Sequence, residues 1–474
     1  MIPPRLAEAS RRMHAAVWEI SSEPLKLVAL PATRDHRRFE DLDWSLAHPV
    51  PTFPAHWGRI FEQKWFRLET PALDEWHYLF WRDQAEATLY ADGVPWAGFD
   101  VAHRYVRLPD SASDLSVEAI CCQSAIWHPD ATGIDTGGSR LEGAFPARRD
   151  EAAWQVAIDF SLLLDLAVYL ARRDGFDPKD VVSGERFRRP LLRVSPEARL
   201  IFSELDRITD EYDRNGAAAI VDPLLELRSR LQAGDPSMAV TLTGHAHIDL
   251  VWLWPRRVGE AKAVHSFATA NRLMAQFPDF HFGYSQPASY EAVERRAPGL
   301  MEQVRGRIDE GRWEPCGAMY VESDTQLACG EALLRGLLLG QEGFKKLTGS
   351  GSRVVWLPDV FGYTGCLPRL MRETGAEYFF TTKQAWSNST RFPFSSFRWR
   401  GNDGTEVTAH VLHSLLANCY NTTTAIDEIV EPTLSHQQAG VHPEALVPVG
   451  YGDGGGGPTE EMCERVRRLG ELQG

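Results

Sequence analysis

From residue 238 to the end of the chain, short apolar runs alternate with amphipathic helical segments. The apolar run Val240–Thr243 precedes a helical pattern over Glu260–Gln276, and a second apolar run follows at Phe280–Ser285. The alternation then continues through the segments Glu331–Lys346, Val354–Leu357, Pro368–Thr374 and Tyr378–Thr381. Strands separated by helices pair in parallel. This half of the chain therefore predicts a parallel sheet, either open or closed into a barrel.

The N-terminal half has two other periodicities. Short alternating runs between residues 57 and 126, with a turn signal at Asp92-Gly93, predict a small β-sandwich. Between residues 150 and 231 the apolar residues follow a helical period, and a second helix is predicted over Pro196–Asn215. A chain of 474 residues is longer than the length that usually folds around a single hydrophobic core. We therefore expect a multidomain α/β protein with an N-terminal β-sandwich-like domain (1–149), a helical connector (150–235) and a β/α barrel domain (236–474).

The last predicted helix, Met462–Leu472, has no strand after it. We therefore expect the barrel to be incomplete, with its C-terminal part beyond Gly474.

The net charge of −15 disfavours a nucleic acid or an anionic membrane as partner. The sequence has neither an apolar run of about 18 residues, as a membrane-spanning helix needs, nor a signal-peptide pattern. Its seven cysteines lack CxxC spacing and are predicted to be reduced thiols. We expect a cytoplasmic location, and homo-oligomerisation stays open.

The first predicted strand of the β/α domain runs into a group of metal-binding side chains. His245, His247 and Asp249 alternate after Val240–Thr243, so an extended backbone would direct all three to one side. Imidazole nitrogens and carboxylate oxygens are donors that suit zinc, and the carboxyl ends of parallel strands are where such folds build their sites. The alternative is that both histidines are structural and bond to neighbouring strand ends.

Two further strand ends carry carboxylates. Asp359 follows Val354–Leu357 beside an aromatic residue and a glycine, and could instead cap the next helix. Asp453 follows a strand and precedes four glycines. Such a glycine run can bind phosphate, but it lacks the GKS or GKT ending of a P-loop, and Asp453 would repel phosphate.

Three segments, GHAHIDLVWLWP, WLPDVFGYTGCLP and GYGDGGGGPT, occur in this order. They closely resemble the glycoside hydrolase family 38 α-mannosidases, particularly the cytosolic, vacuolar and bacterial branch. The resemblance covers about Thr241 to Thr459 and is reinforced by Gly311–Pro315, Val321–Asp324 and Gly330–Arg335. The N-terminal segments also look like the leader domains of this branch, although no single motif there is diagnostic.

The resemblance implies a (β/α)7-type barrel and a zinc ion held by His247, Asp249 and Asp359, with His245 outside the coordination sphere. The family's fourth ligand is a downstream histidine, which we expect beyond Gly474. Trp252 and Phe361 match aromatic residues that line the mannose subsite in relatives. Their alternative role is packing in the barrel core.

The implied function is hydrolysis of terminal α-linked mannose from oligosaccharides by a zinc-assisted retaining mechanism. One carboxylate attacks the anomeric carbon and a second protonates the leaving oxygen, and Asp359 and Asp453 suit these roles. Glu322 and Asp324 remain alternative acids, because the family's Gly-Asp turn varies in sequence.

Two other functions stay open at this stage. A zinc amidohydrolase barrel also begins its metal site with His-x-His, and it would need a metal-bridging lysine, here Lys383, and later histidines, here His410 and His413. The other alternative is a non-catalytic, carbohydrate-binding paralogue that keeps the barrel as a scaffold. The presence of all the expected acids speaks against loss of catalysis.

Overall fold

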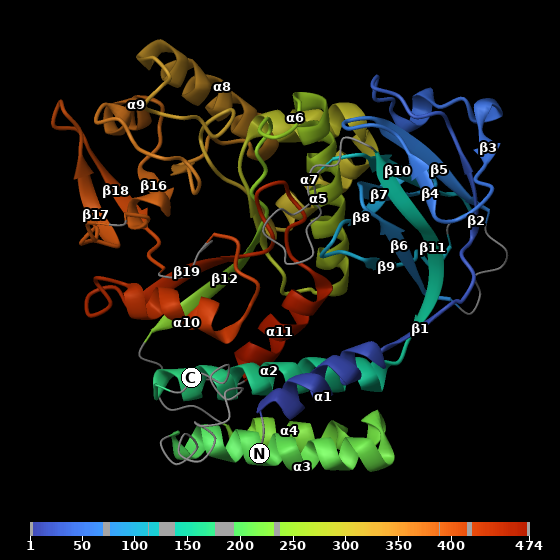
Figure 1. Cartoon of the computed structure of the whole chain (residues 1–474). Helices are drawn as coiled ribbons and strands as arrows, with labels where there is room; N and C mark the ends of the chain where they lie inside the picture. Colours follow the sequence, from blue (N-terminus) through green and yellow to red (C-terminus); the bar gives the residue numbers. More distant parts are fainter. Residues whose placement is uncertain are drawn as a thin grey trace.

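The computed structural model describes residues 3–69, 76–111, 113–122, 138–175, 194–231, 238–387, 389–414 and 420–471. Figure 1 shows two antiparallel sheets from the N-terminal part, a layer of helices at one end, and parallel strands with covering helices from the C-terminal part. The predicted multidomain α/β architecture is confirmed at this level. The predicted domain boundaries stay predictions, and the boundary at 235/236 lies outside the described residues.

The two antiparallel sheets share one hydrophobic core. Leu79 and Leu141 of the first sheet are buried in the same cluster as Leu89 and Val117 of the second. The first sheet has the order β1-β11-β6-β9 with β4 beside β11, from β1 (Trp18–Ile20), β4 (Ala55–Trp57), β6 (Tyr78–Asp83), β9 (Tyr105–Arg107) and β11 (Ser139–Arg149). The second has the order β3-β2-β5-β10-β7-β8, from β2 (Lys26–Ala29), β3 (His48–Pro49), β5 (Gln63–Glu69), β7 (Glu86–Ala91), β8 (Val94–Phe99) and β10 (Leu115–Ile120).

The predicted turn at Asp92-Gly93 joins β7 to β8. Ala91 pairs with Val94 across this two-residue loop, and both turn residues have positive φ, 48° for Asp92 and 82° for Gly93. Such a turn matches the twist of the flanking strands and favours Asp-Gly, so the sequence signal and the backbone agree here.

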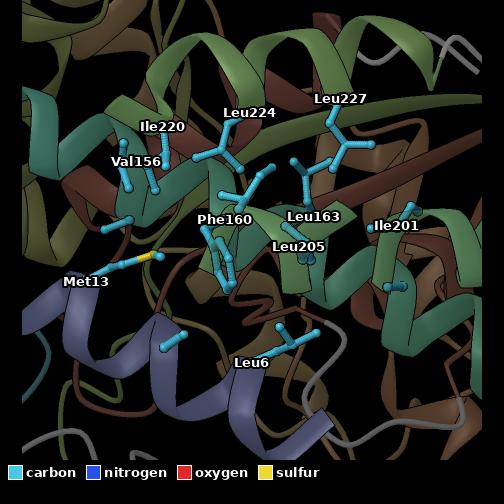
Figure 2. Packing of buried hydrophobic residues seen from close by; sticks show 14 of the residues in the cluster. Leu6, Met13, Val156, Phe160, Leu163, Ile201, Leu205, Ile220, Leu224 and Leu227 are labelled. Carbon is cyan, nitrogen blue, oxygen red and sulfur yellow. The ribbon is translucent and has the colours of Figure 1, made fainter. Parts of the chain in front are cut away.

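Four helices form the layer at one end of the molecule. They are α1 (Pro3–Ala15), α2 (Glu151–Arg173), α3 (Pro196–Asn215) and α4 (Val221–Arg230). Figure 2 shows Leu6 and Met13 of α1 directed at the same apolar interior as Phe160 of α2 and Leu205 of α3. By length and composition α2 could cross a membrane, but more than half of its apolar window is buried in this core, as expected for a core helix.

The C-terminal half contains the parallel strands that hold the predicted site. One sheet has the order β14-β13-β12-β19, from β12 (Ala239–His245), β13 (Phe282–Tyr284), β14 (Trp313–Pro315) and β19 (Glu444–Val449). The other has the order β15-β16-β18-β17, from β15 (Val354–Trp356), β16 (Tyr378–Thr381), β17 (Ser396–Arg400) and β18 (Glu406–Val411). All their pairs are parallel except β17 with β18. A parallel bridge between Gly317 and Val355 continues the order from β14 to β15.

Helices cover these strands. They are α5 (Arg256–Gln276), α6 (Pro287–Arg296), α7 (Pro298–Asp309), α8 (Gly330–Thr348), α9 (Leu367–Glu373), α10 (Ile426–Ser435) and α11 (Glu460–Glu471). Helix α5 lies between the parallel strands and the N-terminal sheets, where it packs against β7 and β8 (Figure 1). Inside the strand layer, Trp356 and Phe380 of one sheet share a small buried cluster with Leu446 of the other, so the two sheets face one another.

Candidate active site

The predicted site residues lie together at the carboxyl ends of three parallel strands. His247 and Asp249 follow β12, Asp359 follows β15, and Asp453 follows β19. Each of the four can offer one ligand atom within 4.8 Å of the others. The structure thus brings together residues that are up to 206 positions apart in the sequence, from 247 to 453.

His247 is at the centre of this cluster, and its side chain is 3% exposed. Its Nε2 lies 3.8 Å from Asp249 Oδ1 and 3.6 Å from Asp359 Oδ2. Both distances exceed those of ordinary hydrogen bonds, and Nε2 has no hydrogen-bond partner among the described residues. A buried donor group that faces two carboxylates without bonding to either fits a position beside a metal ion.

The other ring nitrogen of His247 faces a carboxylate behind the cluster. Nδ1 lies 3.4 Å from Glu322 Oε2, and Glu322 Oε1 accepts a 2.5 Å hydrogen bond from Ser285 Oγ. Burial raises the pKa of Glu322 to about 7, against the opposing effects of His247 and Ser285. Carboxylates often orient metal-binding histidines by accepting a hydrogen bond from the second ring nitrogen, and Glu322 lies beside that nitrogen although neither Nδ1 nor Oε2 forms a hydrogen bond among the described residues. Glu322 therefore contacts the rear edge of His247 rather than the open side of the cluster.

Asp359 is held as an ionised carboxylate by several groups. Lys383 Nζ lies 2.5 Å from its Oδ1, and the Tyr420 hydroxyl donates to the same oxygen over 2.6 Å. Burial raises the pKa of Asp359, but the hydrogen bonds and charges of His247, Lys383 and Tyr420 outweigh burial and hold the pKa below its usual range. A permanently ionised carboxylate suits a nucleophile or a metal ligand.

Asp453 is 6% exposed and shares the Tyr420 hydroxyl with Asp359. The hydroxyl oxygen is 3.1 Å from Asp453 Oδ1 as well as 2.6 Å from Asp359 Oδ1. A phenol has only one proton to donate. When that proton goes to Asp359, a protonated Asp453 can donate to the phenol oxygen, which is the state required of a general acid.

The alternative acids are in other environments. Asp324 Oδ1 accepts hydrogen bonds from the backbone amides of Gln326 (2.7 Å) and Leu327 (2.8 Å) and so caps a local turn. Glu322 is buried against His247. Of the described acids, Asp453 is the one that shares a hydroxyl with Asp359.

The residues present fit a divalent cation. Lys383 supplies one positive charge to a cluster that contains the carboxylates of Asp249, Asp359 and Asp453. Buried or half-buried charges need compensation, and one imidazole nitrogen with carboxylate oxygens is a donor set that zinc accepts. A second group whose side chains could hold a metal ion, Asp100, His103 and His265, occurs elsewhere among the described residues.

The other predicted residues differ in how closely they are tied to the cluster. His245 Nδ1 bonds the carbonyl oxygen of Gly283 on β13 over 2.9 Å, and burial lowers its pKa to about 4, which matches the structural role considered from the sequence. Phe361 is 70% exposed, and its ring lies 4.7 Å from Lys383 Nζ. Trp252 packs edge-on against Trp254, with ring centroids 5.7 Å apart. Both predicted aromatic residues are at least partly open to solvent rather than buried in a core.

Of the residues that an amidohydrolase site would need, Lys383 lies at the cluster, whereas both histidines are engaged elsewhere. Lys383 forms an ion pair with Asp359, His410 Nδ1 bonds Ser396 Oγ over 2.9 Å, and His413 Nε2 bonds the Phe394 carbonyl over 2.9 Å. Neither histidine belongs to the metal-binding cluster in the described part of the chain.

Sequence reasoning missed Tyr420 and the contact of Lys383 with Asp359. Tyr420 belongs to none of the recognised motifs, and nothing in its sequence neighbourhood marks it. Lys383 follows the carboxyl end of β16, which is a weak positional signal for a site residue in a parallel sheet.

Residues 237–474, half of the chain, match the model of the glycosyl hydrolases family 38 N-terminal domain. The chain belongs to glycosyl hydrolase family 38. The resemblance drawn from the three sequence segments is therefore confirmed, and it extends over the strands that hold the cluster.

Relatives of known name agree with this membership. Alpha-mannosidase 2C1 of Homo sapiens is 35% identical over 423 residues, which cover 86% of this chain and 39% of that protein. Alpha-mannosidase G of Dictyostelium discoideum is 37% identical over 235 residues, covering 50% of this chain and 21% of that protein. The chain thus spans well under half the length of both relatives. A crystal structure of an alpha-mannosidase from Enterococcus faecalis V583 aligns with a TM-score of 0.41 and 19% identity, over 50% of this chain and 27% of that one. This last likeness adds nothing to the assignment.

Proposed function

We propose that this protein is a retaining, zinc-dependent α-mannosidase that removes terminal α-linked mannose from oligosaccharides. The observation that carries the proposal is the convergence of His247, Asp249, Asp359 and Asp453 at strand ends in a chain of glycosyl hydrolase family 38. The related proteins of similar sequence are named as α-mannosidases. The finer architecture proposed with this function is an N-terminal β-sandwich, a helical connector and a (β/α)7-type barrel.

The zinc ligands proposed are His247, Asp249 and Asp359. Support comes from the buried and unbonded Nε2 of His247, which faces both carboxylates. When bound, the ion would supply a template for neighbouring sugar hydroxyls, which favours mannose because its 2-hydroxyl is axial. Phe361 and Trp252 would pack against the apolar face of the sugar, and their exposed rings are consistent with that role.

Asp359 is the proposed nucleophile. Its ionised carboxylate attacks the anomeric carbon, the bond from that carbon to the leaving oxygen breaks, and Asp453 gives its proton to the leaving oxygen. In the second step, a water molecule gives a proton to Asp453. The oxygen of that water attacks the anomeric carbon, and the bond from this carbon to the Asp359 carboxylate breaks. The two carboxyl groups offer oxygens within 4.8 Å of one another, closer than the roughly 6.5–9.5 Å typical of inverting enzymes.

The decisive experiment traps the ester. We expect a fluorinated mannosyl fluoride to inactivate the purified protein and to add one sugar mass to the peptide that contains Asp359, and proton NMR to detect the α-anomer of mannose as first product. Labelling of another residue, or the β-anomer as first product, would reject the mechanism. A protein that binds mannosides but never turns them over would instead support the carbohydrate-binding alternative.

The role of Asp453 needs its own variant. Asp453→Asn removes the transferable proton, so turnover of substrates with poor leaving groups should fall at least about 10²-fold, while added azide restores turnover of an activated aryl mannoside. Bound zinc should stay at the wild-type level. Loss of zinc together with activity would make Asp453 a ligand and not the acid.

A further inference from the structure

The glycine-rich turn that carries Asp453 has an unusual backbone. Asp453 has a φ of 50°, and Gly454 to Gly457 have φ values of 129°, 92°, 91° and 68°. Left-handed conformations cost free energy for any residue with a Cβ atom and persist only where surrounding structure enforces them. Something outside the turn must therefore hold Asp453 in place.

The turn closes on itself through one pair of backbone hydrogen bonds. Tyr451 and Gly457 exchange N–H···O bonds of 2.9 Å each. This pair fixes the base of the turn but leaves the residues from 452 to 456 to find other partners. The amide of Gly455 reaches the carbonyl oxygen of His247 over 3.2 Å, and the amide of Gly456 donates to Ser266 Oγ on α5 over 3.0 Å.

A third support comes from the N-terminal part of the chain. His103, in the loop after β8, donates from Nε2 to the carbonyl oxygen of Pro458 over 2.9 Å. Its Nδ1 lies 3.0 Å from Asp100 Oδ1. Because a carbonyl oxygen only accepts, and an ionised carboxylate only accepts, both ring nitrogens of His103 must donate.

Asp100 is built to hold this ring. It accepts from the backbone amides of Ala102 (2.7 Å) and His103 (2.8 Å) and, at Oδ2, from His265 Nε2 on α5 over 3.1 Å. The side chains of Asp100, His103 and His265 are 2%, 7% and 4% exposed. A buried carboxylate with this many donors has little freedom to move. The Asp100–His103 pair is therefore a rigid attachment point for Pro458.

The turn also packs directly on this pair. A Cβ atom added to Gly456 would lie 3.0 Å from Asp100 Oδ2 and 3.5 Å from the His103 ring. One added to Gly455 would lie 2.5 Å from Ser266 Oγ. The glycines at these positions are required by close approach to the supports as well as by their positive φ.

We propose that His103, oriented by Asp100, is a positioning residue for Asp453: by binding Pro458 it fixes the glycine-rich turn and thereby sets where the acid carboxyl lies. The proposal rests on the proposed function for the role of Asp453, although the bracing of the turn does not. It assigns the N-terminal part of the chain a part in catalysis. An alternative use of Asp100, His103 and His265 as a second metal site is an outcome of the test.

Two substitutions of one residue separate the contacts. His103→Gln keeps an amide nitrogen near the position of Nε2 and so retains a donor to Pro458. His103→Asn keeps a nitrogen near the position of Nδ1 and retains the contact with Asp100 alone. A control, Arg296→Gln, removes the 2.7 Å ion pair with Glu118 that joins α6 to β10. It perturbs the same boundary between the N-terminal sheets and the helices without removing a support of the turn.

The first measurement is hydrogen–deuterium exchange on the 474-residue chain, which needs no enzymatic activity. We expect amides of residues 450–457 to exchange at least about tenfold faster in His103→Asn, and near the wild-type rate in His103→Gln and Arg296→Gln, with β13 unchanged in all three. Unchanged exchange of the turn in His103→Asn, or equal acceleration in both His103 variants, would overturn the proposal. So would loss of one equivalent of bound zinc in either His103 variant, because that result would identify a second metal site.

The second measurement separates acid placement from general damage. His103→Asn should lower kcat/KM for a mannoside with a poor leaving group at least about tenfold more than for a dinitrophenyl mannoside, whose departure needs no proton. Arg296→Gln should lower both equally or neither. Equal losses on both substrates in His103→Asn would refute the positioning role. If the wild-type protein hydrolyses neither mannoside, the proposed function fails, and the exchange result still decides whether His103 braces the turn.

Discussion

Lys383 Nζ lies 2.5 Å from Oδ1 of Asp359, and the Lys383 side chain is 4% exposed. The opposite oxygen, Oδ2, faces His247 Nε2 at 3.6 Å. The two oxygens of the proposed nucleophile thus have different neighbours, a fixed cation on one side and the proposed metal position on the other.

Removing this cation should impair catalysis more than binding. Lys383→Met leaves Asp359 without its nearest positive charge, and we expect kcat on a dinitrophenyl mannoside to fall by about 10²–10³-fold, the range found when one preorganised electrostatic partner is lost. Lys383→Arg should recover part of the loss. The control is Lys346→Met, since Lys346 pairs with Glu342 on the exposed face of α8. A kcat for Lys383→Met within twofold of wild type would contradict the role of Lys383.

Metal content is expected to depend on His247 and, more weakly, on Glu322. His247→Ala removes a proposed ligand and should abolish stoichiometric zinc after dialysis, as measured by inductively coupled plasma mass spectrometry. Glu322→Gln weakens the orientation of the His247 ring and should lower zinc affinity about 10–100-fold. Asp324→Asn is the matched control, because Asp324 caps a turn two residues away. Full zinc in His247→Ala would disprove the proposed site.

The site residues that could be predicted from the sequence are those that follow a predicted strand. His247, Asp359 and Asp453 each lie within four residues of the end of an apolar strand, and parallel strands bring such ends to one edge, so their convergence needed no long-range information. Tyr420 could not be predicted, because only the folded chain carries its hydroxyl to both Asp359 and Asp453.

In the fold, too, elements defined by local sequence could be predicted, and long-range packing could not. The helix predicted over Pro196–Asn215 and the strand over Tyr378–Thr381 have those same bounds in the structure, since local sequence defines both: the helix has an apolar period and an N-terminal cap at Ser195, and the strand is a short apolar run. Helices α6 and α7 did not stand out, because Pro298 interrupts their joint pattern. The packing of α1 with α2, α3 and α4 is a long-range choice that no local pattern of Pro3–Ala15 encodes.

The helical layer should be sensitive to cavities. Phe160 is fully buried among α1, α2 and α3 (Figure 2), so Phe160→Ala should lower the free energy of unfolding by about 3–5 kcal/mol. The measurement is urea denaturation followed by circular dichroism. Leu225→Ala is the control on α4, where the side chain is 40% exposed, and it should change the free energy by less than about 1 kcal/mol. Similar losses in the two variants would mean that the helical layer is not packed as described.

Asp83 should make stability depend on pH. It is half-buried in the first antiparallel sheet, where it accepts hydrogen bonds from Trp57 Nε1 (3.1 Å) and Ser139 Oγ (2.5 Å). Burial raises its pKa from 3.8 to about 6, and these hydrogen bonds oppose the rise only in part. Between these values the folded state binds more protons than the unfolded state, so stability falls as pH rises.

The stabilisation by the proton on Asp83 is therefore fully present below about pH 4 and is lost as pH passes about 6, with a maximum change of about 3 kcal/mol at 1.36 kcal/mol per pKa unit. Asp83→Asn cannot ionise. The difference in unfolding free energy between wild type and Asp83→Asn should shift in favour of the variant as pH rises from 4 to 7, because only wild type then holds a charged, partly desolvated carboxylate at this position. Asp110→Asn, at a carboxylate whose side chain is 89% exposed, should give a difference from wild type that is flat over the same range. A flat difference for Asp83→Asn as well would contradict this prediction. It would mean that the carboxyl of Asp83 has the same pKa in the folded and unfolded states, so that its ionisation beside Trp57 and Ser139 does not destabilise the fold.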